Sequence, residues 1–256
     1  MLVLPAALVL AALAGQPPGP SRSQPSSCPE MADALQDLIR HDVRMRDWPE
    51  LARYHDANEG LPPTVSAPRV VFIGDSITDS WQQPQFGSFF SNPQYVDRGI
   101  SAQTTPQMLV RFRPDVIALD AKVVVILAGT NDIAGNTGPM TDEEIEGNLA
   151  SMAELAHAHG IKVVLASVTP TSAYHTRPGG TPQTTVRPMS RIRALNDWMK
   201  KYAADNGDVY LDYFSSMVDE NGVMKAEFTQ DDLHPNAAGY AVMASRAEDA
   251  IKQALR

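Results

Sequence analysis

Short apolar runs alternate with amphipathic segments along most of the chain. Apolar runs of strand length lie at residues 69–73, 122–127, 161–166 and 208–211, with a weaker one at 94–98. Apolar residues at helical spacing between and after these runs predict helices at 106–112, 141–159, 189–204 and 239–255. Strands that alternate with helices favour an α/β fold, in which about five parallel strands form a central sheet between two layers of helices.

Local sequence signals support several of these boundaries. Thr141 and Glu144 have the spacing of a capping box, and Gly160 is expected to end the helix that they begin. Residues 31–48 carry apolar side chains near helical spacing and predict a further helix. Residues 169–188 are rich in proline, glycine and threonine, and they predict either a solvent-exposed connection or a loop long enough to cover a site.

The N-terminal residues have the pattern of an export signal. Residues 2–14 are mostly apolar, are too short to span a bilayer, and end in the small-residue pattern of a cleavage site near Ala14 and Gly15. No positive charge stands near the start, so a mis-assigned start codon or an apolar tail stays an alternative. We expect a secreted or periplasmic protein with a signal peptide over 1–15, a flexible linker over 16–29 and one folded domain over 30–256.

The composition excludes several classes of protein. The 256 residues are 43% hydrophobic and carry a formal net charge of −9, without the run of lysine and arginine that a nucleic-acid-binding surface needs. Cys28 is the single cysteine, which excludes an internal disulfide framework and a cysteine-based zinc site. No segment beyond the N-terminus is apolar over the length of a membrane span. We therefore expect neither a nucleic-acid partner nor stable membrane insertion.

Candidate chemistry follows directly after the predicted strands, because ligand sites in parallel sheets lie beyond the carboxyl ends of the strands. Ser76 follows the first strand within the segment Gly74-Asp-Ser-Ile-Thr78, and the helix that comes next could stabilise negative charge at its N-terminus. The segment is neither a G-x-S-x-G elbow nor a phosphate-binding loop. Taken alone, Ser76 fits a helix N-cap more readily than a nucleophile.

His234 lies just before the last predicted helix, in the segment Asp231-Asp-Leu-His234. A carboxylate three residues before an imidazole can reach its Nδ1 and leave Nε2 free as a base, as in a nucleophile–base–acid triad. A bend at this place would put Asp231 on the same side as His234, and Asp232 is then expected to face solvent or to cap the helix. A chance histidine in a solvated acidic loop is the alternative.

Gly99 and Asn131 also follow predicted strands. The backbone N–H of Gly99 and the side-chain amide of Asn131 could donate to a developing oxyanion, although both residue types are common in turns. Each feature is weak alone. Their joint position after successive parallel strands is what favours a catalytic site.

Four blocks of the sequence resemble those of the SGNH, or GDSL, hydrolase family, and they come in the family's order. Residues 74–78 resemble the block with the nucleophilic serine, 98–101 the block with an oxyanion glycine, 129–132 the block with an oxyanion asparagine, and 231–234 the block with the acid and the base. One departure is Asp97, where the family often has asparagine. The chain looks most similar to the acetylhydrolase-type branch, which includes platelet-activating-factor acetylhydrolase catalytic subunits and bacterial carbohydrate acetylesterases.

This resemblance implies a flavodoxin-like three-layer α/β/α fold and a serine esterase that cleaves short-chain, in particular acetyl, esters through an acyl-enzyme intermediate. It implies a triad of Ser76, Asp231 and His234, and oxyanion donors at Ser76, Gly99 and Asn131. It implies neither a metal nor an organic cofactor. Two alternatives stay open: an O-acetyltransferase on the same scaffold, and a non-catalytic module that binds polysaccharide.

The substrate is less well specified by the sequence. Trp81, Phe86 and His175 are candidates for lining a substrate pocket, although Trp81 is equally suited to core packing. The expected partner is a small-molecule or carbohydrate ester. The sequence does not specify an oligomeric state.

Overall fold

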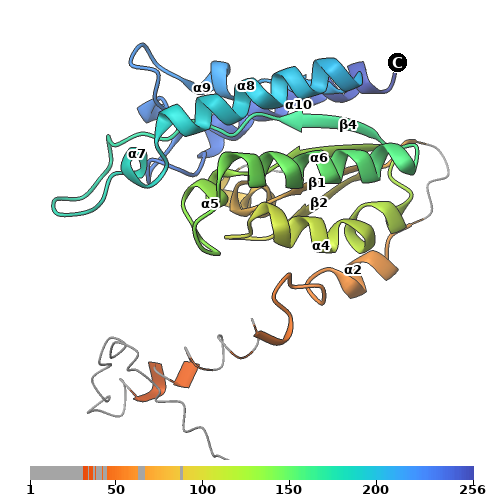
Figure 1. Cartoon of the computed structure of the whole chain (residues 1–256), viewed down its shortest axis with the longest axis horizontal. Coiled ribbons are helices and arrows are strands. Elements are labelled where there is room, and N and C mark those ends of the chain that lie inside the picture. Colours follow the sequence, from red (N-terminus) through yellow and green to blue (C-terminus); the bar gives the residue numbers. More distant parts are fainter. Residues whose placement is uncertain are drawn as a thin grey trace, which may run out of the picture. The chain divides into compact units, whose positions relative to one another are not determined.

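The computed structural model describes residues 31–33, 35–36, 38, 42, 45–62, 67–86 and 89–256. Arg46–Arg256 form one compact unit. The expected signal peptide, the expected linker and Cys28 lie outside the described residues, as does much of the helix expected over 31–48. The strands and helices labelled in Figure 1 all belong to Arg46–Arg256.

Five parallel strands form the sheet in the described part of the chain. They are β1 (Val70–Gly74), β2 (Tyr95–Gly99), β3 (Val123–Leu127), β4 (Lys162–Ala166) and β5 (Val209–Leu211), in the spatial order β2-β1-β3-β4-β5. This is the flavodoxin order, in which the direction of winding reverses between β1 and β3. The sheet confirms the fold class expected from the sequence, and it predicts a ligand site at the carboxyl ends of β1 and β3.

Helices cover both faces of this sheet (Figure 1). The long ones are α4 (Thr105–Asp115), α6 (Asp142–Ala158), α8 (Met189–Asn206) and α10 (Ala237–Ala254). Buried side chains of α4, α6 and α8 share one core with the sheet, and those of α10 share the other. The shorter helices are α2 (His55–Glu59), α3 (Ser76–Asp79), α5 (Thr130–Ile133), α7 (Gln183–Val186) and α9 (Phe214–Met217), with 3₁₀ turns at Ser80–Gln82, Pro84–Phe86, Ile117–Leu119 and Ala226–Phe228.

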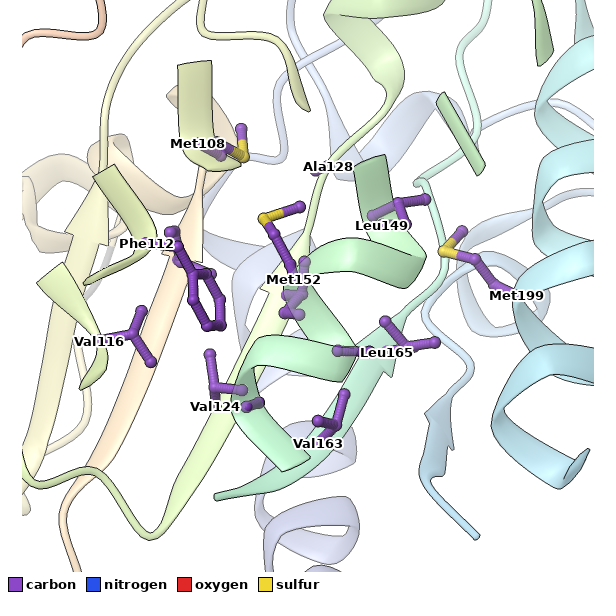
Figure 2. Close-up of a cluster of buried hydrophobic side chains, with 14 of the residues drawn as sticks. Met108, Phe112, Val116, Val124, Ala128, Leu149, Met152, Val163, Leu165 and Met199 are labelled. Carbon is purple, nitrogen blue, oxygen red and sulfur yellow. The ribbon is translucent and has the colours of Figure 1, made fainter. Parts of the chain in front are cut away.

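Alternate residues of each strand enter opposite cores, as the two-residue period of a strand requires. Val124 and Leu165 belong to the core that contains Phe112 of α4 and Met152 of α6 (Figure 2). Their chain neighbours, among them Val125, belong to the core on the side of α10. Both faces of the sheet are therefore buried, which explains why the strands are continuous apolar runs rather than alternating ones. Each fully buried aliphatic or aromatic side chain contributes roughly 1.5–3 kcal/mol to this packing.

Local chemistry fixes the ends of the helices. The N–H of Glu144 donates to Oγ1 of Thr141 at 3.2 Å, and the N–H of Thr141 donates to Oε2 of Glu144 at 2.8 Å, which is the capping box expected at the start of α6. Gly160 follows α6 with a φ of 69°, a left-handed conformation that favours glycine.

The expected loop over 169–188 contains α7, one short helix that the sequence pattern did not predict. None of the helices in the described part of the chain combines the length and the apolar character needed to cross a bilayer.

Candidate active site

The turn between β1 and α3 presents Ser76 at the carboxyl edge of the sheet. Asp75, rather than Ser76, caps α3, because Oδ1 of Asp75 accepts the N–H of Ile77 at 2.9 Å. The Ser76 hydroxyl is therefore free of the capping role that suits a serine at such a junction. Gly74 is required for space: a Cβ there would lie 2.1 Å from Oγ1 of Thr78. Burial raises the pKa of Asp75 to about 6, and the hydrogen bond from Ile77 opposes this effect.

Ser76 contacts a histidine from the far end of the chain. Oγ of Ser76 lies 2.9 Å from Nε2 of His234, and Nδ1 of the same ring lies 2.7 Å from Oδ2 of Asp231. The His234 side chain is 32% exposed, so a substrate can reach it from solvent. A hydroxyl, an imidazole and a carboxylate in this order can transfer the hydroxyl proton to the imidazole while the carboxylate orients the ring.

Asp231 shapes the loop that carries His234. Its Oδ1 accepts the backbone N–H of His234 at 2.8 Å and that of Leu233 at 3.1 Å, while its Oδ2 faces the imidazole. Partial burial favours the neutral acid, but the His234 ring and these N–H groups outweigh it and hold the pKa of Asp231 far below its ordinary value. Asp231 is therefore an anion, and an anion beside Nδ1 favours the tautomer that carries its proton on that nitrogen.

Asn131 is buried in α5, directly after β3, and its side-chain amide is held at both ends. Nδ2 donates to the carbonyl of Gln103 at 3.0 Å, and Oδ1 accepts from Nη2 of Arg187 at 3.2 Å. A primary amide carries two N–H bonds. One of them therefore stays available to a group in the cavity that Asn131 lines.

Gly99 does not join the other expected site residues. Its N–H donates to Oδ1 of Asp97 at 2.7 Å, and Gly99 is not among the described residues that line the cavity. A Cβ at Gly99 would lie 2.1 Å from the backbone nitrogen of Asp79, so this position requires glycine for close packing against α3. Ala102, further along the same loop, lines the cavity with a left-handed φ of 67°. No acceptor for the Ala102 N–H is present among the described residues.

The cavity beside Ser76 and His234 has a volume of about 500 Å³. Most of the lining residues have polar side chains, although apolar atoms form the larger part of the exposed wall, and Arg187 contributes one cation. Besides Ser76, Ala102, Asn131, Asp231 and His234, the lining residues are Ser80, Gln83, Phe86, Ser101, Asn136, Arg187 and Leu233.

The comparisons with known proteins give the family of the chain. A sequence model of the GDSL-like lipase/acylhydrolase family matches residues 72–242. The chain belongs to this family. The GDSL-like hydrolase is accordingly a carboxylic ester hydrolase, and no curated protein matches its sequence significantly.

Solved structures give the same family. A Bacteroides fragilis protein described as an acylhydrolase is 41% identical, with a TM-score of 0.74, over 82% of this chain and 99% of that one. A GDSL-like lipase from Bacteroides thetaiotaomicron is 39% identical, with a TM-score of 0.72, over 80% of this chain and 98% of that one. An acetylxylan esterase from Geobacillus stearothermophilus shares the fold at 21% identity and a TM-score of 0.58, over 73% of this chain and 94% of that one.

Two of the residues expected to line the substrate pocket lie elsewhere in the GDSL-like hydrolase. Trp81 is 3% exposed and packs edge-on against Phe72 and tilted against Tyr240, which makes it a core residue. His175 is exposed, and it is not among the described residues that line the cavity. Phe86 does line the cavity.

Asp232 corrects a further expectation, because it neither faces solvent nor caps the last helix. It is buried, and its carboxylate accepts the hydroxyls of Ser172 at 2.6 Å and Thr176 at 3.0 Å and the backbone N–H of His175 at 3.0 Å. Burial alone would raise the pKa of Asp232, but these hydrogen bonds outweigh it and hold the pKa below its ordinary value. Asn236 provides the cap of α10 instead. Asp232 points away from His234, as expected, but it points into the loop after β4.

Arg187 is a charged lining residue that the sequence pattern did not single out. It stands directly before Pro188, in the loop after β4, and the residue before a proline is kept out of the helical region. It therefore ends α7 with φ −126° and ψ 82°. Arg187 lies in the connection that follows the carboxyl end of a parallel strand, and this position could have marked it as a candidate site residue.

One group with the spacing of metal ligands is present among the described residues. His55, Asp56 and Glu59 lie on α2, and all three are exposed. None of them lines the cavity. The group therefore has no part in the site described above.

Proposed function

We propose that the protein hydrolyses short-chain esters, acetyl esters above all, with Ser76 as the nucleophile. The observation that carries this proposal is the 2.9 Å separation between Oγ of Ser76 and Nε2 of His234, with Asp231 on the other nitrogen of the ring. His234 accepts the hydroxyl proton as Oγ bonds to the ester carbonyl carbon. The resulting tetrahedral intermediate collapses when His234 returns that proton to the leaving alcohol. A water molecule, deprotonated by the same ring, then attacks the carbonyl carbon of the acyl-enzyme, and the acid is released when His234 returns the proton to Oγ of Ser76.

The developing oxyanion has three candidate donors at the cavity. They are the N–H of Ser76, at the start of α3, the free N–H of the Asn131 amide, and the N–H of Ala102. We propose Ala102 in place of Gly99, because the Gly99 N–H is already bonded to Asp97 and Ala102 lines the cavity. A left-handed alanine costs about 1–2 kcal/mol, and such strain concentrates at functional sites.

The cavity wall supports a small acyl group and a polar alcohol. Ser80, Gln83, Ser101 and Asn136 offer hydroxyls and amides that can bond sugar hydroxyls, while Phe86 and Leu233 offer apolar surface for the acyl methyl group. The acetylxylan esterase with the same fold acts on such a substrate by its description. We propose an acetylated carbohydrate as the substrate, and export of the enzyme to meet it, in keeping with the apolar pattern of residues 2–14.

A panel of esters tests this proposal. We expect 4-nitrophenyl acetate to be cleaved faster than the octanoyl ester, and acetylated xylo-oligosaccharides to release acetate. Gln83→Ala should raise KM for the sugar ester and leave the nitrophenyl ester unchanged. Its matched control is Gln253→Ala, since Gln253 is an exposed glutamine on α10 that is not among the described lining residues. Faster cleavage of the octanoyl ester would overturn the short-chain assignment.

A further inference from the structure

Arg187 is buried against the residues that follow β3. Its Nε donates to Oγ1 of Thr130 at 3.1 Å, and its Nη2 donates to Oδ1 of Asn131 at 3.2 Å. Its Nη1 donates to Oε1 of Gln183 at 2.6 Å. Arg187 as a whole is 7% exposed and lines the cavity, and its guanidinium stays charged because arginine does not lose its proton under ordinary conditions.

These contacts determine which way the Asn131 amide faces. With Oδ1 against the guanidinium and Nδ2 against the Gln103 carbonyl, both ends of the amide meet a partner of opposite polarity. Turning the amide by 180° would place its N–H bonds against a cation and its oxygen against a carbonyl. Both contacts would then be repulsive. The side chain therefore has one stable orientation, and that orientation directs an N–H bond to the cavity.

The same contact changes the strength of the donor. The positive charge beside Oδ1 withdraws electron density from the amide nitrogen of Asn131, so its N–H bonds become stronger donors. Hydrogen bonds that share one amide group strengthen each other when they are buried. Burial lowers the pKa of Arg187, while the carboxyl groups of Asp75 and Asp231 oppose that effect. The guanidinium of Arg187 therefore contacts the oxygen of the Asn131 amide, while the proposed oxyanion would contact its nitrogen. The polarising effect of Arg187 on the amide is largest when negative charge develops at the oxyanion.

We propose that Arg187 is a positioning residue, which acts through Asn131 by fixing and polarising the amide that donates to the oxyanion. This inference rests on the proposed function, because it requires Asn131 to be an oxyanion donor. Arg187 also joins the loop after β4 to the site, since it stands between α7 and α8. The loop over 169–188 therefore contributes to catalysis through one anchored side chain.

A double-mutant cycle on 4-nitrophenyl acetate tests the proposal. Asn131→Ala should lower kcat by roughly 10²–10³-fold, the loss typical of one oxyanion donor, with little change in KM. Arg187→Met should lower kcat by roughly 10- to 100-fold, as expected for a lost hydrogen bond to a charged group, again with KM unchanged. Arg187→Lys keeps the charge but cannot hold both Thr130 and Asn131, so it should recover only part of the rate. Arg193→Met, an exposed site on α8, is the matched control and should leave kcat unchanged.

The decisive result is the double variant. If Arg187 acts through Asn131, Arg187→Met should change kcat by no more than a few-fold when Asn131 is already alanine. A full additional loss in that background would overturn the inference, and so would a rise in KM restricted to esters that carry a carboxylate. If Arg187→Met does not fold, as its melting temperature would show, the same cycle with Arg187→Lys decides. An Asn131→Ala enzyme with normal kcat would instead refute the oxyanion role of Asn131 in the proposed function.

Discussion

Oγ of Ser76 and Nε2 of His234 lie 2.9 Å apart, although 158 positions separate them in the chain. A buried hydrogen bond holds the two segments together, because the Tyr240 hydroxyl on α10 donates to the carbonyl of Ile77 on α3 at 2.7 Å. The helix that follows His234 is thereby fixed to the helix that begins with Ser76. The contact between the two side chains therefore depends on the packing of α10 against the sheet.

Replacing Asp231 tests the orientation of the imidazole. Asp231→Asn should favour the wrong tautomer of His234 and lower kcat by up to about 10⁴-fold, with a smaller loss if a backbone carbonyl shares the orienting role. The variant should fold, because the Asp231 side chain is 54% exposed. Steady-state kinetics on an acetyl ester measures kcat, and circular dichroism shows whether the variant is folded. A kcat within a few-fold of the parent would exclude Asp231 as the acid.

Asp232 should affect stability more than rate. Asp232→Asn places an amide N–H among groups that all donate, so we expect a loss of about 2–3 kcal/mol and a fall in Tm of roughly 5–10 °C. The loss of kcat should be smaller than for Asp231→Asn. Asp205→Asn is the control, since Asp205 is an exposed carboxylate on α8. If Asp232→Asn keeps its Tm but loses more activity than Asp231→Asn, the roles of the two carboxylates are reversed.

Asp97 should make stability depend on pH. Burial raises the pKa of Asp97 to about 7, and the hydrogen bond from the Gly99 N–H opposes this effect. The unfolded chain releases the proton near pH 4, so between pH 4 and 7 the folded state binds more protons, and the free energy of unfolding falls as the pH rises. Asp97→Asn removes this cost and can still accept the Gly99 N–H.

Urea unfolding at two pH values measures that effect. We expect Asp97→Asn to be more stable than the parent at pH 8, by an amount on the order of 2–4 kcal/mol, and to show a smaller advantage at pH 5. The Asp205→Asn control should not show this difference between the two pH values. An equal stability difference at both pH values would contradict the raised pKa.

Much of the fold and part of the site could be predicted from sequence. The strands are apolar runs because both faces of the sheet are covered, and parallel strands bring the residues after them to one edge. Ser76 and Asn131, which follow β1 and β3, could therefore be placed at this edge from the sequence, whereas His234 is singled out by its spacing from Asp231. The distribution of roles within a loop is harder to predict, because it depends on backbone conformation.

Three residues illustrate that limit. Gly99 serves close packing rather than facing the cavity, and Ala102 reaches the cavity through a left-handed turn that alanine rarely adopts. Arg187 contacts Asn131 across 56 positions of chain, a distance over which no local pattern applies. Loop contacts of this kind are set by tertiary packing, so they become visible only in the structure.

Covalent labelling of the nucleophile tests the central claim most directly. The enzyme is treated with an organophosphonate ester, residual acetyl-esterase activity is followed, and the modified peptide is identified by mass spectrometry. We predict one adduct, on Ser76, formed in proportion to the loss of activity. Ser76→Ala should take up no label and should lose activity by about 10⁶-fold while remaining folded. Labelling of another serine, with hydrolysis retained by Ser76→Ala, would contradict the account.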